Sequence, residues 1–114
     1  MEIRERTSGD VTILDLKGRL ILGDGEQAFR ELVHGPTYLG CHKLLLNFAG
    51  VTSLDSAGIG SLVWKYVTMK KQGGDLKLMH LTQRSRDILW VTKLNTVFET
   101  FDSEAAALKS FEEK

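Results

Sequence analysis

The feature that most constrains this sequence is an apolar run at residues 43–48, Lys-Leu-Leu-Leu-Asn-Phe. A continuous apolar run of this length is typical of a strand that is buried on both faces. Strands of that kind belong to parallel sheets covered by helices, whereas a membrane-spanning helix needs about 20 apolar residues. The run therefore predicts an α/β protein, and 114 residues is the length of one domain.

Segments with strand character alternate with segments with helix character along the chain. Residues 2–7 and 11–17 flank the turn Ser8-Gly9-Asp10 and predict a β-hairpin. Further strands are predicted at 43–48 and 76–81, with a short one near 97–98, and residues 49–54 are expected to form a loop. Helices are predicted over about 25–38, from Asp55-Ser56 to Gly73-Gly74, over 83–94 and over 103–112.

This order of elements predicts a single-domain α/β fold over residues 1–114. An opening β-hairpin followed by right-handed parallel crossovers gives a mixed sheet of four to five strands, packed with about four helices. Asp24 is expected to cap the first helix. The apolar stripe of that helix is Ala28, Phe29, Leu32 and Val33, and the stripe of the second is Ile59, Leu62, Val63, Tyr66 and Val67.

Composition excludes several classes of function. Fifteen basic and fifteen acidic residues cancel, so direct binding to nucleic acid is not expected. A single cysteine, Cys41, allows no intrachain disulfide, and without an apolar leader or spanning segment the chain is expected to be cytoplasmic, with no membrane insertion. The three histidines and Cys41 match no zinc spacing, and no P-loop or nucleophile elbow is present. We therefore predict no metal, no cofactor and no catalytic residue.

The candidate functional segment is the start of the second predicted helix, Asp55-Ser56-Ala57-Gly58-Ile59-Gly60. Asp and Ser are both good N-cap residues, and the free N–H groups of a first helical turn favour anions. Two glycines in one turn cost about 1 kcal/mol each relative to Ala, which indicates that something lies close to the backbone there. One interpretation is a capped helix whose glycines pack tightly on the sheet. The other is that Ser56 lies at the surface and accepts a phosphoryl group that switches partner binding.

These residues, together with 44–48 and Gly50-Val51-Thr52 before them, resemble the bacterial anti-sigma factor antagonists of the STAS domain family. The segment 16–20 resembles the family at the end of its second strand, and residues 89–98 followed by Asp102-Ser103 fit its C-terminal half. The resemblance covers nearly the whole chain and implies a STAS-like fold.

The resemblance also implies a phosphoprotein that regulates transcription by partner switching. Its unphosphorylated form would bind an anti-sigma factor that is also a serine kinase, thereby releasing a sigma factor. Phosphorylation of Ser56 would end the complex, and a separate PP2C-like serine phosphatase would restore it. Residues 55–60 and Trp64 are the predicted partner-binding residues, and the antagonist itself is not an enzyme. The pathway and the oligomeric state are left open.

The sequence departs from the family at three positions. Ala57 stands where members often have Ser or Thr, which leaves Ser56 as the only hydroxyl of the pair. Ile21 replaces an Asp that some members carry three residues after the glycine that matches Gly18. Trp64 replaces a residue that is usually small or basic, and it lies off the apolar stripe. It is either an exposed anchor for a partner or a ring that covers the edge of the core.

Two other functions remain open from the sequence. A STAS scaffold or a transporter-associated module would have the same fold without the phosphorylation switch. A carrier protein with a phosphopantetheine arm on Ser56 would also show Asp-Ser, but such carriers are acidic helical bundles. The predicted strands and the neutral charge disfavour the carrier.

Overall fold

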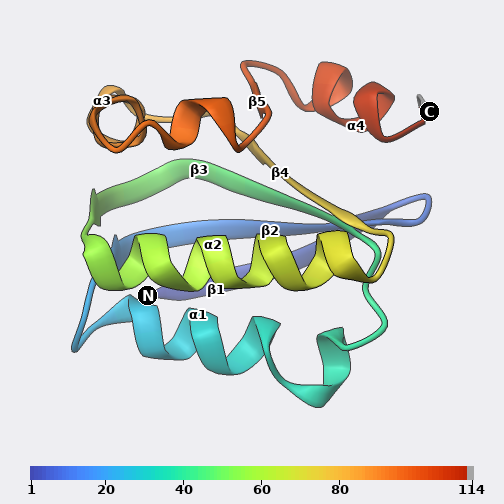
Figure 1. Cartoon of the computed structure of the whole chain (residues 1–114), viewed down its shortest axis with the longest axis horizontal. Helices are drawn as coiled ribbons and strands as arrows, with labels where there is room; N and C mark the ends of the chain where they lie inside the picture. The colour runs from blue at the N-terminus through green and yellow to red at the C-terminus, as the bar shows by residue number, and fades with distance from the viewer. Residues whose placement is uncertain (113–114) are drawn as a thin grey trace.

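The computed structural model describes residues 1–112, which form a five-stranded mixed sheet with helices on both faces (Figure 1). The strands are β1 (Glu2–Ser8), β2 (Val11–Leu20), β3 (Lys43–Leu54), β4 (Asp75–Met79) and β5 (Thr100–Phe101). The helices are α1 (Gly25–Val33), α2 (Ser56–Lys71), α3 (Gln83–Val91) and α4 (Glu104–Glu112), with short 3-10 helices η1 (Pro36–Tyr38) and η2 (Leu94–Thr96). Strand order follows chain order, with β1 antiparallel to β2 and every later pair parallel. The predicted fold class is confirmed.

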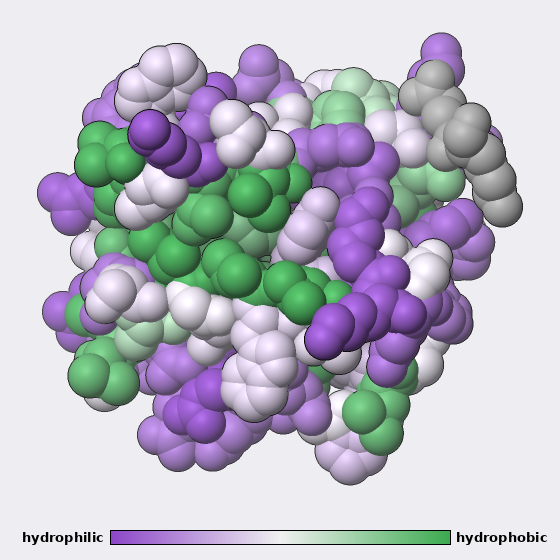
Figure 2. Space-filling model, viewed as in Figure 1, coloured by the Kyte–Doolittle hydropathy of each residue, from purple (hydrophilic) through white to green (hydrophobic). Residues whose placement is uncertain are grey.

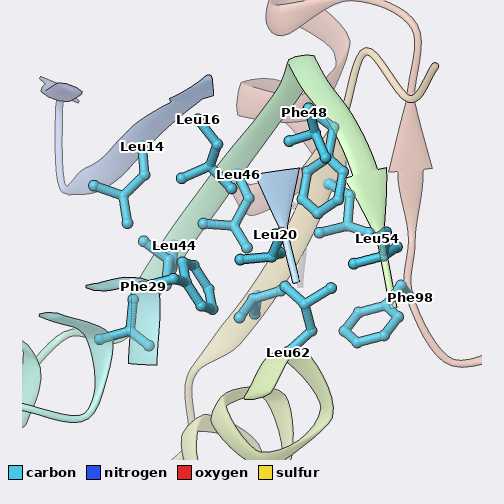
Figure 3. Packing of buried hydrophobic residues seen from close by; sticks show 14 of the residues in the cluster. Leu14, Leu16, Leu20, Phe29, Leu44, Leu46, Phe48, Leu54, Leu62 and Phe98 are labelled. Carbon is cyan, nitrogen blue, oxygen red and sulfur yellow. The ribbon is translucent and has the colours of Figure 1, made fainter. Parts of the chain in front are cut away.

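The main core lies between the sheet and the pair α1 and α2, which run side by side along one face (Figure 1). Alternate residues of β3, Leu44 and Leu46, point into this layer and are fully buried. They meet Phe29 of α1 and Leu62 of α2, as Figure 3 shows. Leu45 points to the opposite face and is also fully buried, so both faces of β3 are covered, as the apolar run predicted.

The second face of the sheet carries a smaller core under α4. Ile13 and Leu45 pack there against Ala107 and Phe111. Ser103 caps this helix by accepting a hydrogen bond from the N–H of Ala106 at 3.1 Å. The helix predicted over 103–112 is therefore confirmed as Glu104–Glu112, and its buried residues are Ala107 and Phe111.

The first predicted helix is too long by five residues. It ends at Val33, because the Gly35-Pro36 pair starts the 3-10 helix η1 instead. Asp24 takes the N-cap position, but its side chain makes no capping hydrogen bond and pairs with Arg19 at 2.7 Å. The predicted stripe was also wrong at one position. Ala28 is exposed, and the acidic Glu26 is buried instead.

The predicted loop at 49–54 is instead the second half of β3. Here β3 continues its pairing with β2, but two irregularities each add one residue to β3. Such bulges bend a strand and interrupt its side-chain alternation. That is why the small and polar residues of this stretch resembled a loop, although Val51 and Leu54 are buried.

The C-terminal half needs smaller corrections. The helix predicted over 83–94 ends at Val91, and the strand predicted near 97–98 lies at Thr100–Phe101. Phe98 lies outside the strands and is buried in the main core, so it is apolar because it packs there and not because it pairs in a strand.

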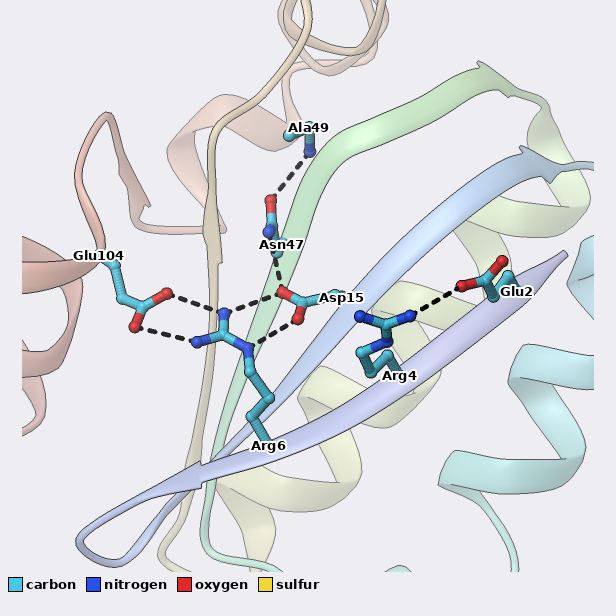
Figure 4. A network of polar contacts seen from close by, with 7 residues as sticks. All are labelled: Glu2, Arg4, Arg6, Asp15, Asn47, Ala49 and Glu104. Atoms are coloured by element: carbon cyan, nitrogen blue, oxygen red, sulfur yellow. Dashed lines mark hydrogen bonds and ion pairs between the residues drawn. The ribbon is translucent and has the colours of Figure 1, made fainter.

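A polar clamp holds α4 to the hairpin across the second face (Figure 4). The Arg6 guanidinium donates to Asp15 at 2.7 and 2.9 Å and to Glu104 at 2.8 and 3.2 Å. Asn47 extends the chain of contacts, donating to Asp15 at 2.8 Å and accepting from the N–H of Ala49 at the first bulge. The hydrogen bonds from Arg6 hold the pKa of Glu104 below its ordinary value.

We expect Glu104→Gln to lower the free energy of unfolding by less than about 1 kcal/mol, because the side chains of the clamp are partly solvated. Since the folded-state pKa of Glu104 is lowered, its contribution is present at neutral pH and is lost as pH falls below its ordinary pKa near 4.5. Urea unfolding at pH 7 and pH 3 measures this directly. The matched control is Glu2→Gln, which removes the exposed Arg4–Glu2 pair at 3.6 Å and is expected to change stability by only a few tenths of a kcal/mol. If Glu104→Gln and the unmodified chain differ in stability by the same amount at pH 3 as at pH 7, the role of the clamp is contradicted.

Candidate functional site

The candidate site lies where β3 ends and α2 begins, at the edge of the sheet where β2 also ends. Asp55 is the N-cap of α2, and its Oδ1 accepts a hydrogen bond from the Gly58 N–H at 3.0 Å. Its Oδ2 accepts from the N–H of Leu22 at 3.0 Å, in the loop before α1. The N–H groups of Gly58 and Leu22 hold the pKa of Asp55 below its ordinary value, so it is an anion at neutral pH.

Ser56 is the first residue of α2, and it is exposed. Among residues 1–112, no side-chain hydrogen bond engages its hydroxyl group. Its two neighbours in the chain, Asp55 and Ala57, are half-buried. The hydroxyl is therefore accessible to another protein without displacement of any part of the fold.

The two glycines of the first turn have different roles. A Cβ at Gly58 would lie 2.2 Å from the carbonyl oxygen of Leu20, so only glycine fits between α2 and the end of β2. A Cβ at Gly60 would meet nothing within 4 Å, and Gly60 is exposed. The expectation of close backbone contact is confirmed for Gly58 and is wrong for Gly60.

An exposed stripe extends from Ser56 along α2. Gly60, Trp64 and Val67 follow at helical spacing, and Trp64 and Val67 are 59% and 41% exposed. Trp64 does not cover the core edge; its ring stacks on His34, at the C-terminal end of α1, with 4.4 Å between centroids. Val67, predicted to be on the buried stripe, lies on this exposed side instead.

Sequence reasoning missed buried polar contacts that join α2 to α1 and to η1. The Ser61 hydroxyl donates to Glu26 at 2.5 Å, and both side chains are buried. The buried Lys65 ammonium donates to the Tyr38 carbonyl at 3.2 Å, and burial lowers its pKa. These contacts join residues more than 25 positions apart. The one sequence signal was the Glu26–Arg30 spacing, which forms an ion pair at 2.8 Å.

The family of the chain follows from comparison with known proteins. The family model for the STAS domain matches residues 2–107. The chain belongs to the STAS domain family. No curated protein matches its sequence.

Solved structures share the fold of this STAS domain at low sequence identity. A Thermotoga maritima protein, proposed to be an anti-sigma factor antagonist, superposes with a TM-score of 0.85 at 20% identity, covering 97% of this chain and 95% of that one. The anti-sigma factor antagonist SpoIIAA gives 0.81 at 16% identity in its unphosphorylated form, covering 99% and 98%. Its phosphorylated form, from Bacillus, gives 0.73 at 17% identity, covering 96% and 98%. A sulfate transporter family protein from Wolinella succinogenes gives 0.75 at 18% identity, covering 90% and 85%.

Across residues 1–112, no three His, Cys, Asp or Glu side chains gather as a set that could hold a metal ion. Within the same residues, no helix has both the length and the apolar character to cross a bilayer.

The two glycines give a matched pair of substitutions. We expect Gly58→Ala to destabilise the domain by about 1–3 kcal/mol, because the added methyl group overlaps the Leu20 carbonyl. Gly60→Ala should be neutral or stabilising by up to about 1 kcal/mol, because its site is open and Ala is the better helix former. Urea unfolding curves compare the two variants with the unmodified chain. Equal effects of the two substitutions would contradict the assigned packing.

Proposed function

We propose that this STAS domain is an anti-sigma factor antagonist controlled by phosphorylation of Ser56. The unphosphorylated domain binds an anti-sigma factor that is also a serine kinase, and a sigma factor is released. The kinase transfers a phosphoryl group from ATP to the Ser56 hydroxyl, the complex dissociates, and a PP2C-like phosphatase reverses the modification. The observation that carries the proposal is the exposed, unengaged hydroxyl of Ser56 at the first position of α2.

The surface around Ser56 supports docking of another protein. Figure 2 shows an apolar band across this side of the molecule. The α2 side chains Ile59 and Val63 pack on the core but stay partly exposed, while Trp64 and Val67 are exposed. Large aromatic side chains beside apolar surface are typical of the centres of protein interfaces.

Electrostatics explains why a phosphate would end such a complex. A phosphoserine carries about −1.5 to −2 charges at pH 7. Asp55 already places one negative charge at this helix start and already engages the Gly58 N–H. The phosphate therefore adds to an existing anion instead of filling an empty anion site. A partner with an apolar or acidic contact surface would be repelled, while the fold would lose no hydrogen bond of Ser56.

The relatives support a regulated binding role in different ways. SpoIIAA is an anti-sigma factor antagonist whose structure exists in unphosphorylated and phosphorylated forms. The likeness to a sulfate transporter family protein supports the second candidate, a transporter-associated module without the switch. The two candidates differ in whether Ser56 is modified by a bound kinase.

Affinity capture with the full chain, with and without ATP, tests the switch. We expect a serine kinase to be retained without ATP and released with ATP, with mass spectrometry locating the phosphoryl group on Ser56. Purified phosphoprotein should bind that kinase at least about tenfold more weakly, because like charges in an interface are costly. Its melting temperature should stay within a few degrees of the unmodified chain.

Ser56→Ala is the control for this experiment, since it should retain the kinase in both conditions. Capture of a membrane transporter with no ATP dependence would favour the second candidate. A kinase that modifies a different residue would contradict the role of Ser56.

Two exposed tryptophans allow a matched test of the docking surface. We expect Trp64→Ala to weaken binding of the kinase by about tenfold or more, as truncation of a buried aromatic anchor does. Trp90→Ala, on α3, removes a ring that is 70% exposed and lies outside the α2 stripe, so its effect should be within about twofold. Calorimetric titration of both variants gives the comparison. A larger loss for Trp90→Ala would move the docking surface to α3.

A further inference from the structure

The Asp55 carboxylate joins two parts of the molecule that are more than 30 residues apart in sequence. One oxygen caps α2 through the Gly58 N–H, and the other accepts from the Leu22 N–H, each at 3.0 Å. Leu22 belongs to the loop 21–24, which connects β2 to α1. The other backbone hydrogen bonds of this loop are local, since the N–H groups of Asp24 and Glu26 both donate to the Ile21 carbonyl. The bond to Asp55 is therefore what ties the loop to the start of α2.

The hydrogen bond to Asp55 positions Leu22, whose side chain is apolar and largely exposed. Leu22 is 72% exposed, more than Trp64 or Val67 on the α2 stripe. Its N–H lies against the carboxylate of the residue that precedes Ser56, so Leu22 stands at the same edge of the domain as the serine. An isolated exposed leucine needs no explanation, but one held next to a docking surface by a long-range hydrogen bond adds apolar area to that surface.

We infer that Asp55 is a positioning residue: it holds the loop 21–24 so that Leu22 and the α2 stripe form one continuous contact surface for the same partner. This inference rests on the proposed function, because it names a second contact element of that docking site. An aspartate suits the task because both of its oxygens accept hydrogen bonds. An asparagine caps a helix equally well but has a single acceptor oxygen, so it cannot serve both N–H groups.

Asp55→Asn is therefore expected to remove the hydrogen bond to the Leu22 N–H and to keep the one to the Gly58 N–H. Amide hydrogen exchange measured by NMR reports on each N–H group individually. In the unmodified chain, we expect slow exchange at both Gly58 and Leu22. In Asp55→Asn, we expect Gly58 to stay protected and Leu22 to exchange at least about tenfold faster. Leu22→Ala should leave both amides protected, because it alters only the side chain. Undiminished protection of the Leu22 amide in Asp55→Asn would overturn the inference.

A double-mutant cycle on the kinase identified by affinity capture tests the contact itself. We expect Leu22→Ala to weaken binding by about tenfold and Asp55→Asn by a similar factor. If Asp55 acts through Leu22, Asp55→Asn should cause no further loss in the Leu22→Ala background. Full additivity of the two losses, or a loss for Asp55→Asn that disappears in high salt, would show that Asp55 acts by its own charge and would overturn the inference.

The two proposals fail in distinguishable ways. If no kinase binds the unmodified chain, the proposed function fails and the partner contact of Leu22 fails with it. The exchange rates still decide whether Asp55 holds the loop. If the kinase binds and Leu22→Ala has no effect, the proposed function stands and the contact role of Leu22 is wrong.

Discussion

The geometry of the candidate site depends on how closely two helices approach the end of one strand. A Cβ at Gly58 would lie 2.2 Å from the carbonyl oxygen of Leu20, and a Cβ at Gly25 would lie 2.3 Å from the carbonyl oxygen of Arg19. Two consecutive residues of β2 thus contact the two helices: Leu20 contacts the first turn of α2, and Arg19 contacts the first turn of α1. Because both helices begin against the same strand end, the loop before α1 comes within hydrogen-bonding distance of Asp55.

Polar contacts hold α2 to α1 and to η1, in addition to the apolar packing. The buried Ser61–Glu26 hydrogen bond joins α2 to α1, and the buried Lys65–Tyr38 hydrogen bond joins α2 to η1. Together these two bonds fix the position of α2 along its axis and its rotation about that axis. Buried polar groups add little net stability, but an arrangement that left them unpaired would cost about 1–3 kcal/mol for each group. The position of Ser56 relative to the loop 21–24 is therefore defined by contacts on the far side of α2 from the proposed docking surface.

Patterns within one element were predictable from the sequence, and contacts between elements were not. The leucine run of β3 and the Asp-Ser cap of α2 depend on local periodicity and local hydrogen bonds, so both were found. The second half of β3 was missed because its bulges break the alternation that identifies a strand. Glycine in a helix turn indicated close packing, but only the structure shows that Gly58 is packed and Gly60 is open. The partner of Asp55 in the Leu22 loop lies 33 residues away, beyond any local pattern.

The exposed setting of Ser56 would allow the proposed phosphorylation to control binding and spare the fold. Its hydroxyl engages no other side chain, so a phosphate there breaks no intramolecular bond of the serine. The residues that secure the helix start are Asp55, by its cap, and Gly58, by its packing, and not Ser56 itself. The charge of a phosphoserine is therefore felt almost entirely at the surface, where a partner must approach. A serine placed at position 55 or 58 would link modification to the cap or to the packing, and binding could then change only together with stability.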